Sequence, residues 1–244
     1  MRQVLAIFKR EFAAYFATPV AYVFIVIFLL AMGAFTFYVG HFYDNGVANL
    51  SVFFGYHPWL YLFLVPAVGM RLWAEERRLG TMELLLTLPI PIWASVLGKF
   101  LAAWAFTGVA LALTFPIWIT VNYLGNPDNG AIAASYIGSF LMAGGYLAIS
   151  AAISATTNNQ VIAFVVSVLV CFLFTISGAP LVLDFFQAWA PIVLVNTISS
   201  FSFLTHFQAI SSGVIDLRDL IYFGSLIALF LTVNVVLVDL KKTS

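Results

Sequence analysis

The segment VAYVFIVIFLLAMGAFTFYVG, residues 20–40, contains no Asp, Glu, Lys or Arg. At a rise of about 1.5 Å per residue it forms a helix of about 31 Å, which matches a bilayer hydrocarbon core of roughly 30 Å. It is about twice as long as the apolar region of a signal peptide. We therefore expect it to remain in the mature protein as a first membrane-spanning helix.

Five further uncharged runs of similar length follow along the chain. They cover residues 52–70, 100–121, 132–155, 161–179 and 220–238. Lipid offers no partners for backbone polar groups, and the runs lack the two-residue alternation of barrel strands, so all six are expected to be helices. Only 8% of the 244 residues are charged and 63% are hydrophobic, whereas about a quarter of a soluble domain is charged. The sequence predicts an all-α polytopic membrane protein with a single domain over residues 1–244.

The lysines and arginines predict how the six helices are oriented. If the N-terminus lies inside, nine of the ten basic residues fall in inner segments, and only Arg218 falls outside. The acidic residues divide evenly between the two sides. This pattern follows the positive-inside rule. We expect both termini in the cytoplasm and the protein in the cell inner (plasma) membrane.

The segment before the first span, residues 1–19, has the pattern of an amphipathic helix. Its apolar stripe consists of Val4, Leu5, Phe8, Phe12, Tyr15 and Phe16, opposite Arg2, Gln3, Lys9 and Arg10. Pro19 then turns the chain into the first span. We expect an interfacial helix lying flat among the inner headgroups, with Lys9, Arg10, Glu11 and Phe12 as its candidate functional residues. The alternative is a frayed basic tail that only orients the first span.

The inner connection over residues 72–98 carries most of the cytoplasmic charge, within RLWAEERRLGTMELLLTLPIPIWASVLGK (residues 71–99). Gly80 interrupts the charged helix, Thr81 can cap a new one, and Glu83 suits its positive end. Pro89 ends this helix after about two turns. The pattern predicts a short helix over residues 82–88, whose exposed leucines either rest on the membrane or insert into a soluble partner.

The outer connection over residues 180–219 is mostly apolar but is interrupted by prolines and polar residues. It is expected to dip into the outer leaflet and return as one or two short re-entrant helices shielded by protein. In the fourth span Gly144, Ala148 and Ala152 recur every four residues, and such rows let helices approach closely. We expect that span to lie at the centre of the bundle.

Catalytic motifs are missing from the sequence, and no pair of acidic residues lies within a span. His41, His57 and His206 are far apart and are expected to be hydrogen-bonded surface groups rather than metal ligands. We therefore expect no catalytic residue, no metal site and no bound cofactor in this chain. No basic domain is present that could bind nucleic acid. If the protein moves a substrate uphill, its energy must come from a partner, since the spans lack the ionisable groups of ion-coupled carriers.

Residues 75–103, EERRLGTMELLLTLPIPIWASVLGKFLAA, resemble the loop between the second and third spans of ABC-2-type transporter permeases. The matching positions are Glu75, Glu76, Arg77, Arg78, Gly80, Thr81, Glu83, Leu84, Leu85, Gly98 and Lys99. Residues 8–23, FKREFAAYFATPVAYV, look like the flat N-terminal helix of that family. Residues 204–223, LTHFQAISSGVIDLRDLIYF, are similar to the segment entering the last span in its gliding-motility-type branch.

This resemblance implies a non-catalytic permease subunit that works as a pair, either as a homodimer or as a dimer with a sister permease. Two copies of an ABC ATP-binding subunit would bind ATP and Mg and couple hydrolysis to exporter-like substrate movement. The short inner helix would contact that subunit, the outer helices would gate the exit, and a large extracytoplasmic subunit could bind outside.

Three alternatives compete with this interpretation. In a permease of a binding-protein-dependent importer, the Leu-Pro pair lies farther from the glycine than Leu88-Pro89 lies from Gly80, and the loop comes late in the chain. A non-transporting membrane scaffold or assembly subunit has the same topology. An ion-coupled carrier is disfavoured by the uncharged spans. The residues do not indicate the substrate.

Overall fold

The computed structural model describes every residue except 1, 45, 83–89, 188–189 and 241–244. The described residues form helices and no strand, which confirms the all-α prediction. The long helices are α2 (Pro19–Ala34), which continues as the π-helix η1 (Phe35–Val39), and then α7 (Ile92–Ala112), α9 (Asn129–Ser154), α10 (Gln160–Ile176) and α14 (Leu217–Leu240).

Four helical segments among the described residues are long and apolar enough to cross a membrane. They are Pro19–Val39, Ile92–Leu124 (α7 with α8, Pro116–Leu124), Asn129–Ser154 and Leu217–Leu240. A fifth is possible by joining α10 to α11 (Pro180–Gln187) across a bend of 69°. The described residues thus contain four or five candidate spans by length and composition, and the count of six stays a prediction.

The second predicted span differs because its helix is interrupted. It consists of α3 (Ser51–Gly55) and α4 (His57–Gly69), and α5 (Arg71–Arg78) follows after Met70. Pro58 lies in the first turn of α4, where a missing N–H is tolerated but a helix from the preceding residues is not easily continued. With 13 residues, α4 alone reaches only about 20 Å.

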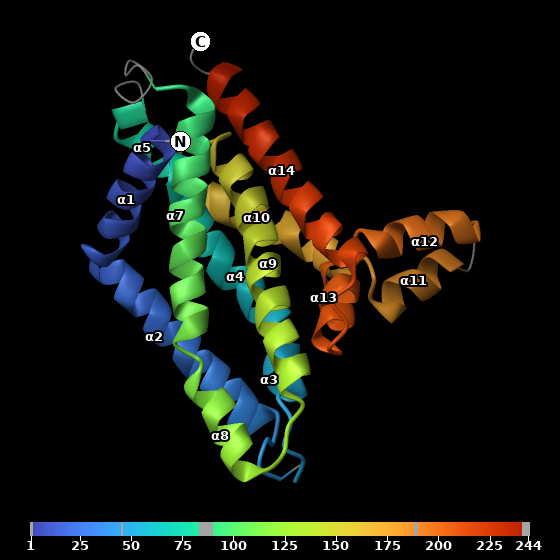
Figure 1. Cartoon of the computed structure of the whole chain (residues 1–244). Coiled ribbons are helices and arrows are strands. Elements are labelled where there is room, and N and C mark those ends of the chain that lie inside the picture. Colours follow the sequence, from blue (N-terminus) through green and yellow to red (C-terminus); the bar gives the residue numbers. More distant parts are fainter. Residues whose placement is uncertain (1, 45, 83–89, 188–189, 241–244) are drawn as a thin grey trace.

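The helices form an elongated bundle (Figure 1). The beginning of α1 (Arg2–Phe16), all of α5 and the end of α14 lie together at one end of this bundle, which we call the α5 end. The opposite end, which we call the α8 end, contains α3 and α8. Helix α1 thus begins, and α14 ends, at the same end of the bundle.

Helix α9 lies at the centre of the bundle, and 78% of its most apolar 18-residue stretch is buried. Helices α4, α7, α10, α13 and α14 pack around it. A side chain at Gly144 would meet the Trp104 indole at 2.8 Å, so glycine permits the contact between α9 and α7. Ala148 and Ala152 are also buried. Helix α10 carries a row of small buried residues that the sequence did not single out: Ala163, Ser167, Cys171 and Thr175. Cys171 and Thr175 of this row hydrogen-bond to Tyr146 in α9.

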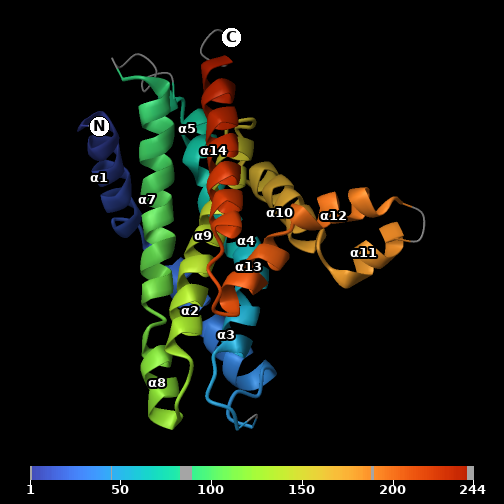
Figure 2. The same cartoon turned by 45° about the vertical axis from the view of Figure 1, so that its right-hand side comes forward.

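The outer connection contains three short helices instead of one or two: α11, α12 (Ile192–Ser200) and α13 (Phe203–Ser211). Helix α13 is anchored in the bundle by Phe203, Phe207 and Ile210, which are buried. In contrast, α11 has no buried residue among those described, and α11 and α12 project sideways from the bundle (Figures 1 and 2). The predicted shielding by protein therefore applies to α13 alone.

Two of the three histidines are buried, so the expectation of surface groups is wrong for them. His57 is fully buried in α4 and hydrogen-bonds through Nδ1 to the hydroxyl of Ser139 in α9. His206 places Nδ1 2.6 Å from Oδ1 of Asp219 and Nε2 3.0 Å from the carbonyl oxygen of Ser200. Both histidines join different helices, and contacts between helices cannot be predicted from the local sequence around each histidine.

Candidate functional site

A buried lysine joins three helices at the α5 end. Lys99, near the beginning of α7, is only 3% exposed, and its Nζ lies 2.6 Å from Oε1 of Glu76 in α5 and 3.4 Å from Oε1 of Glu11 in α1. The ammonium group also lies 5.4 Å from the centre of the Trp73 ring. A charge this buried is stable only when paired. We call Glu11, Glu76 and Lys99 the Lys99 cluster.

Gly98, the residue before Lys99, allows α1 to approach α7. A side chain at Gly98 would lie 2.8 Å from Cβ of Ile7, closer than ordinary packing allows. Farther along both helices, the Tyr15 ring stacks on Phe106 with centroids 4.9 Å apart. Because the contacts advance together, α1 runs along α7 instead of crossing it, as Figure 2 also shows. The ion pair between Glu11 and Lys99 also joins these two helices, while the flat orientation of α1 at the membrane surface stays a prediction.

The charges around Glu11 outweigh the cost of its burial. Burial raises the pKa of the Glu11 carboxyl group. The positive charges and hydrogen bonds of Lys99 and Arg10 lower it by more in total, so the net pKa lies below the ordinary value. Arg10 donates from Nη2 to Glu11 Oε1 at 2.6 Å. Glu11 is therefore held in its charged form. Of the other predicted residues of α1, Lys9 is exposed, and Phe12 packs between the rings of Phe8 and Phe16.

The remaining predicted residues of the inner connection separate into different roles. Glu75 accepts hydrogen bonds from Arg71, from Nε at 2.8 Å and from Nη2 at 3.2 Å. Arg78 is exposed. Gly80 has φ +68°, a left-handed conformation that favours glycine, and it ends the helix as predicted. The Thr81 hydroxyl donates to the carbonyl oxygen of Glu76 at 3.3 Å. Glu83, Leu84, Leu85 and the rest of 83–89 lie outside the described residues.

Helices α5 and α9 cap each other. The Ser154 hydroxyl, at the end of α9, accepts hydrogen bonds from the amides of Trp73 (3.1 Å) and Ala74 (3.0 Å) and donates to the Met70 carbonyl oxygen (2.7 Å). In return, Arg77 donates from Nη1 to the carbonyl oxygen of Ala155 at 3.0 Å. Ser154 was missed by the sequence analysis, because a serine among small residues of a span carries no signal of its distant partner.

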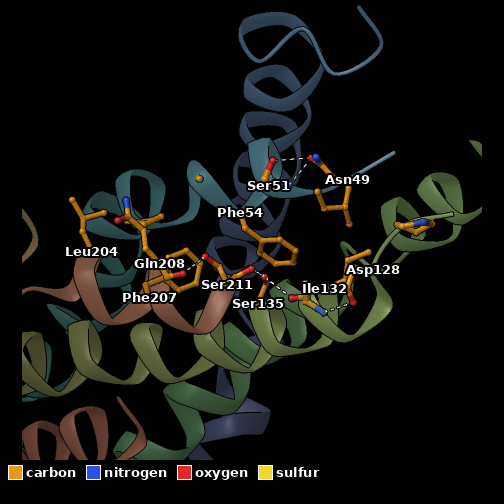
Figure 3. A pocket seen from close by; sticks show the side chains of 15 residues that line it. Asn49, Ser51, Phe54, Asp128, Ile132, Ser135, Leu204, Phe207, Gln208 and Ser211 are labelled. Atoms are coloured by element: carbon orange, nitrogen blue, oxygen red, sulfur yellow. Dashed lines mark hydrogen bonds between the residues drawn. The ribbon is translucent and has the colours of Figure 1, made fainter. Parts of the chain in front are cut away.

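A cavity of about 320 Å³ lies at the α8 end, between α3, the beginning of α9, and α13 (Figure 3). Its polar residues hydrogen-bond mainly to neighbouring protein groups. Asn49 accepts from Ser51, Asp128 caps the amides of Gly130 and Ala131, and Ser135 donates to the carbonyl of Ala131. Phe54 and Phe207 supply apolar walls. The cavity thus lies at a junction of helices whose polar side chains contact neighbouring protein groups.

Within the part of the chain that the structure describes, no three His, Cys, Asp or Glu residues gather as metal ligands would. A family model described as "ABC-2 family transporter protein" matches residues 5–240, nearly the whole chain. The chain belongs to this ABC-2 family. No curated protein matches the chain.

Membership of the ABC-2 family explains why the chain contains several long apolar helices. Its long apolar helices and its family identify it as a multi-pass membrane permease of an ABC transporter. Permeases of this family are transport components that are typically non-catalytic and work with a partner ATP-binding subunit. The charged segment at the α5 end is therefore the candidate functional site of this permease.

Proposed function

We propose that this ABC-2 permease receives force at its α5 end from a separate ATP-binding subunit and moves a substrate across the cell inner membrane as an exporter. The observation that carries the proposal is the Lys99 cluster, which joins α1, α5 and α7 where the inner connection leaves the bundle. A displacement of that connection reaches three helices at once. Residues 75–85 and the N-terminal helix would form the contact surface.

Six spans with both termini in the cytoplasm complete the proposal. Residues 51–69, which form α3 and α4, reach about 28 Å when taken together, close to a hydrocarbon core of roughly 30 Å. Joining α3 to α4 and keeping α10 as a span brings the total to six. The positions of α1, α5 and the end of α14 at one end of the bundle support this topology.

The proposed assembly contains two ATP-binding subunits, which bind ATP and Mg, and two permeases, either identical or sister chains. The similarity of residues 204–223 to the segment entering the last span supports membership of the gliding-motility-type branch. Helices α11 and α12 would bind a large extracytoplasmic subunit, and the exposed Leu181 and Val193 support that contact because both side chains are largely uncovered. The permease itself contributes no cofactor.

The experiment is co-purification with the candidate ATP-binding subunit in mild detergent, followed by measurement of ATP turnover with and without the permease. We expect the triple variant Glu75→Gln, Glu76→Gln and Glu83→Gln to lose the complex or the effect of the permease on turnover. A matched control removes two acids from the other connections, Asp44→Asn and Asp184→Asn. An unchanged complex with unchanged turnover in the triple variant would overturn the proposal.

A further inference from the structure

In the contact between α5 and α9, the short side chain of Ser154 in α9 binds directly to main-chain groups at the beginning of α5. The Lys99 cluster instead joins its helices through long side chains. The first amides of a helix have no partner within it, and Met70, which precedes α5, provides no side-chain cap. Ser154 supplies this cap from another helix. Its hydroxyl makes three hydrogen bonds of 2.7–3.1 Å, and the residue is fully buried.

Arg77 makes the contact reciprocal. The last carbonyl groups of α9 also lack partners within their helix, and that end carries a partial negative charge. The guanidinium group of Arg77 donates a hydrogen bond to the carbonyl oxygen of Ala155, the C-cap residue that follows α9. Each helix therefore completes the hydrogen bonding of the other, although the two lie about 80 residues apart.

The two connections from α5 have different stiffness. Lys99 reaches Glu76 through two long side chains with many rotatable bonds, so α5 and α7 can shift while the ion pair persists. Ser154 has a single rotatable bond before its hydroxyl, and its partners are main-chain groups of three residues. A displacement of α5 must therefore move the end of α9 or break these hydrogen bonds.

We propose that Ser154 and Arg77 are positioning residues that make α5 and α9 move as one body, so that displacement of the inner connection reorients the central helix. This inference rests on the proposed function and adds the route of transmission. Helix α9 has 26 residues and extends about 39 Å toward the cavity at the α8 end. It contacts α4, α7, α10, α13 and α14, so its movement is passed on to most of the bundle.

The test measures movement at the far end of α9 in the complex with the ATP-binding subunit. Spin labels are placed at Ile137 in α9 and Tyr38 in η1, which are 46% and 83% exposed. The distance between them is recorded by pulsed electron paramagnetic resonance before and after adding Mg-ATP. We expect a change in the unsubstituted protein, loss of that change in Ser154→Ala and Arg77→Gln, and its recovery in Ser154→Thr and Arg77→Lys.

The matched control is Ser150→Ala. Ser150 is also fully buried in α9, but its hydroxyl donates within its own helix, to the Tyr146 carbonyl at 2.7 Å. We expect this variant to retain the ATP-dependent change. Complex formation and thermal stability are measured for every variant, and Arg77→Gln serves where Ser154→Ala does not fold.

The outcomes separate the two proposals. A full ATP-dependent change in Ser154→Ala and Arg77→Gln overturns the role of these residues and leaves the proposed function standing. The role of Ser154 and Arg77 is also overturned if Ser150→Ala loses the ATP-dependent change, since removing any buried serine of α9 would then have the same effect. A stable complex whose labels do not respond to ATP in the unsubstituted protein overturns the proposed function, and this inference with it.

Discussion

Replacement of Lys99 by methionine tests the cluster at the α5 end most directly. Methionine keeps most of the apolar stem but removes the ammonium group, and the two carboxylates it contacts, at 2.6 Å and 3.4 Å, would be left facing each other. Their side chains are only 20% and 19% exposed. Removing one partner of a buried ion pair costs about 3–5 kcal/mol, and we expect a loss of this size for Lys99→Met.

A double-mutant cycle separates the two carboxylates. Lys99→Met is combined in turn with Glu76→Gln and Glu11→Gln, and coupling energies of about 0.5–3 kcal/mol are typical of contacting residues. We expect stronger coupling to Glu76 than to Glu11, because its oxygen lies closer to the ammonium group. Arg71 and Glu75, each almost 30% exposed, are the control pair, and we expect them to contribute about 0.5 kcal/mol.

The assay is unfolding of the purified protein in mixed micelles by increasing sodium dodecyl sulfate, followed by tryptophan fluorescence. Refolding from the denatured state must give the same curve, so that free energies of unfolding can be compared between variants. A loss below about 1 kcal/mol for Lys99→Met would refute the reasoning, because that value is typical of a solvated surface pair. Stronger coupling to Glu11 than to Glu76 would contradict the geometry of the cluster.

Two further predictions concern the contact between α1 and α7. Gly98→Ala should lower the free energy of unfolding by about 1–3 kcal/mol, because the added methyl group meets Ile7 at 2.8 Å. The control in the same unfolding assay is Gly33→Ala, because nothing lies within 4 Å of a methyl group there. An equal effect of both substitutions would contradict a specific contact at Gly98. The second prediction is a pH dependence: since the folded pKa of Glu11 lies below its ordinary value of 4.5, its stabilising contribution is complete above that value and is lost as the pH falls through the folded pKa. Unfolding midpoints measured between about pH 6 and pH 3 should therefore decline less in Glu11→Gln than in the unsubstituted protein, and parallel declines would exclude Glu11 as a source.

Helical class and membrane character could be predicted from the sequence, because both depend on the composition of local segments. The point at which a helix is interrupted could not. Residues 52–70 form an uncharged run in the sequence, but the structure breaks this run at Tyr56. Lys99 led us to begin the third span at residue 100, whereas α7 begins at Ile92 and buries the lysine. Charge marks the limit of an apolar run, and only its partners determine whether the helix continues.

The amino-acid sequence by itself determined the membrane class, the helical fold and the location of the charged connection over residues 72–98, since each follows from runs of neighbouring residues. Only the tertiary structure decided which charges and hydroxyl groups meet. Glu76 and Lys99 are 23 positions apart, and Ser154 lies 84 positions from Met70. Such pairs form because close packing of α1, α5, α7 and α9 excludes other partners from buried polar groups, and no local pattern records which partner remains.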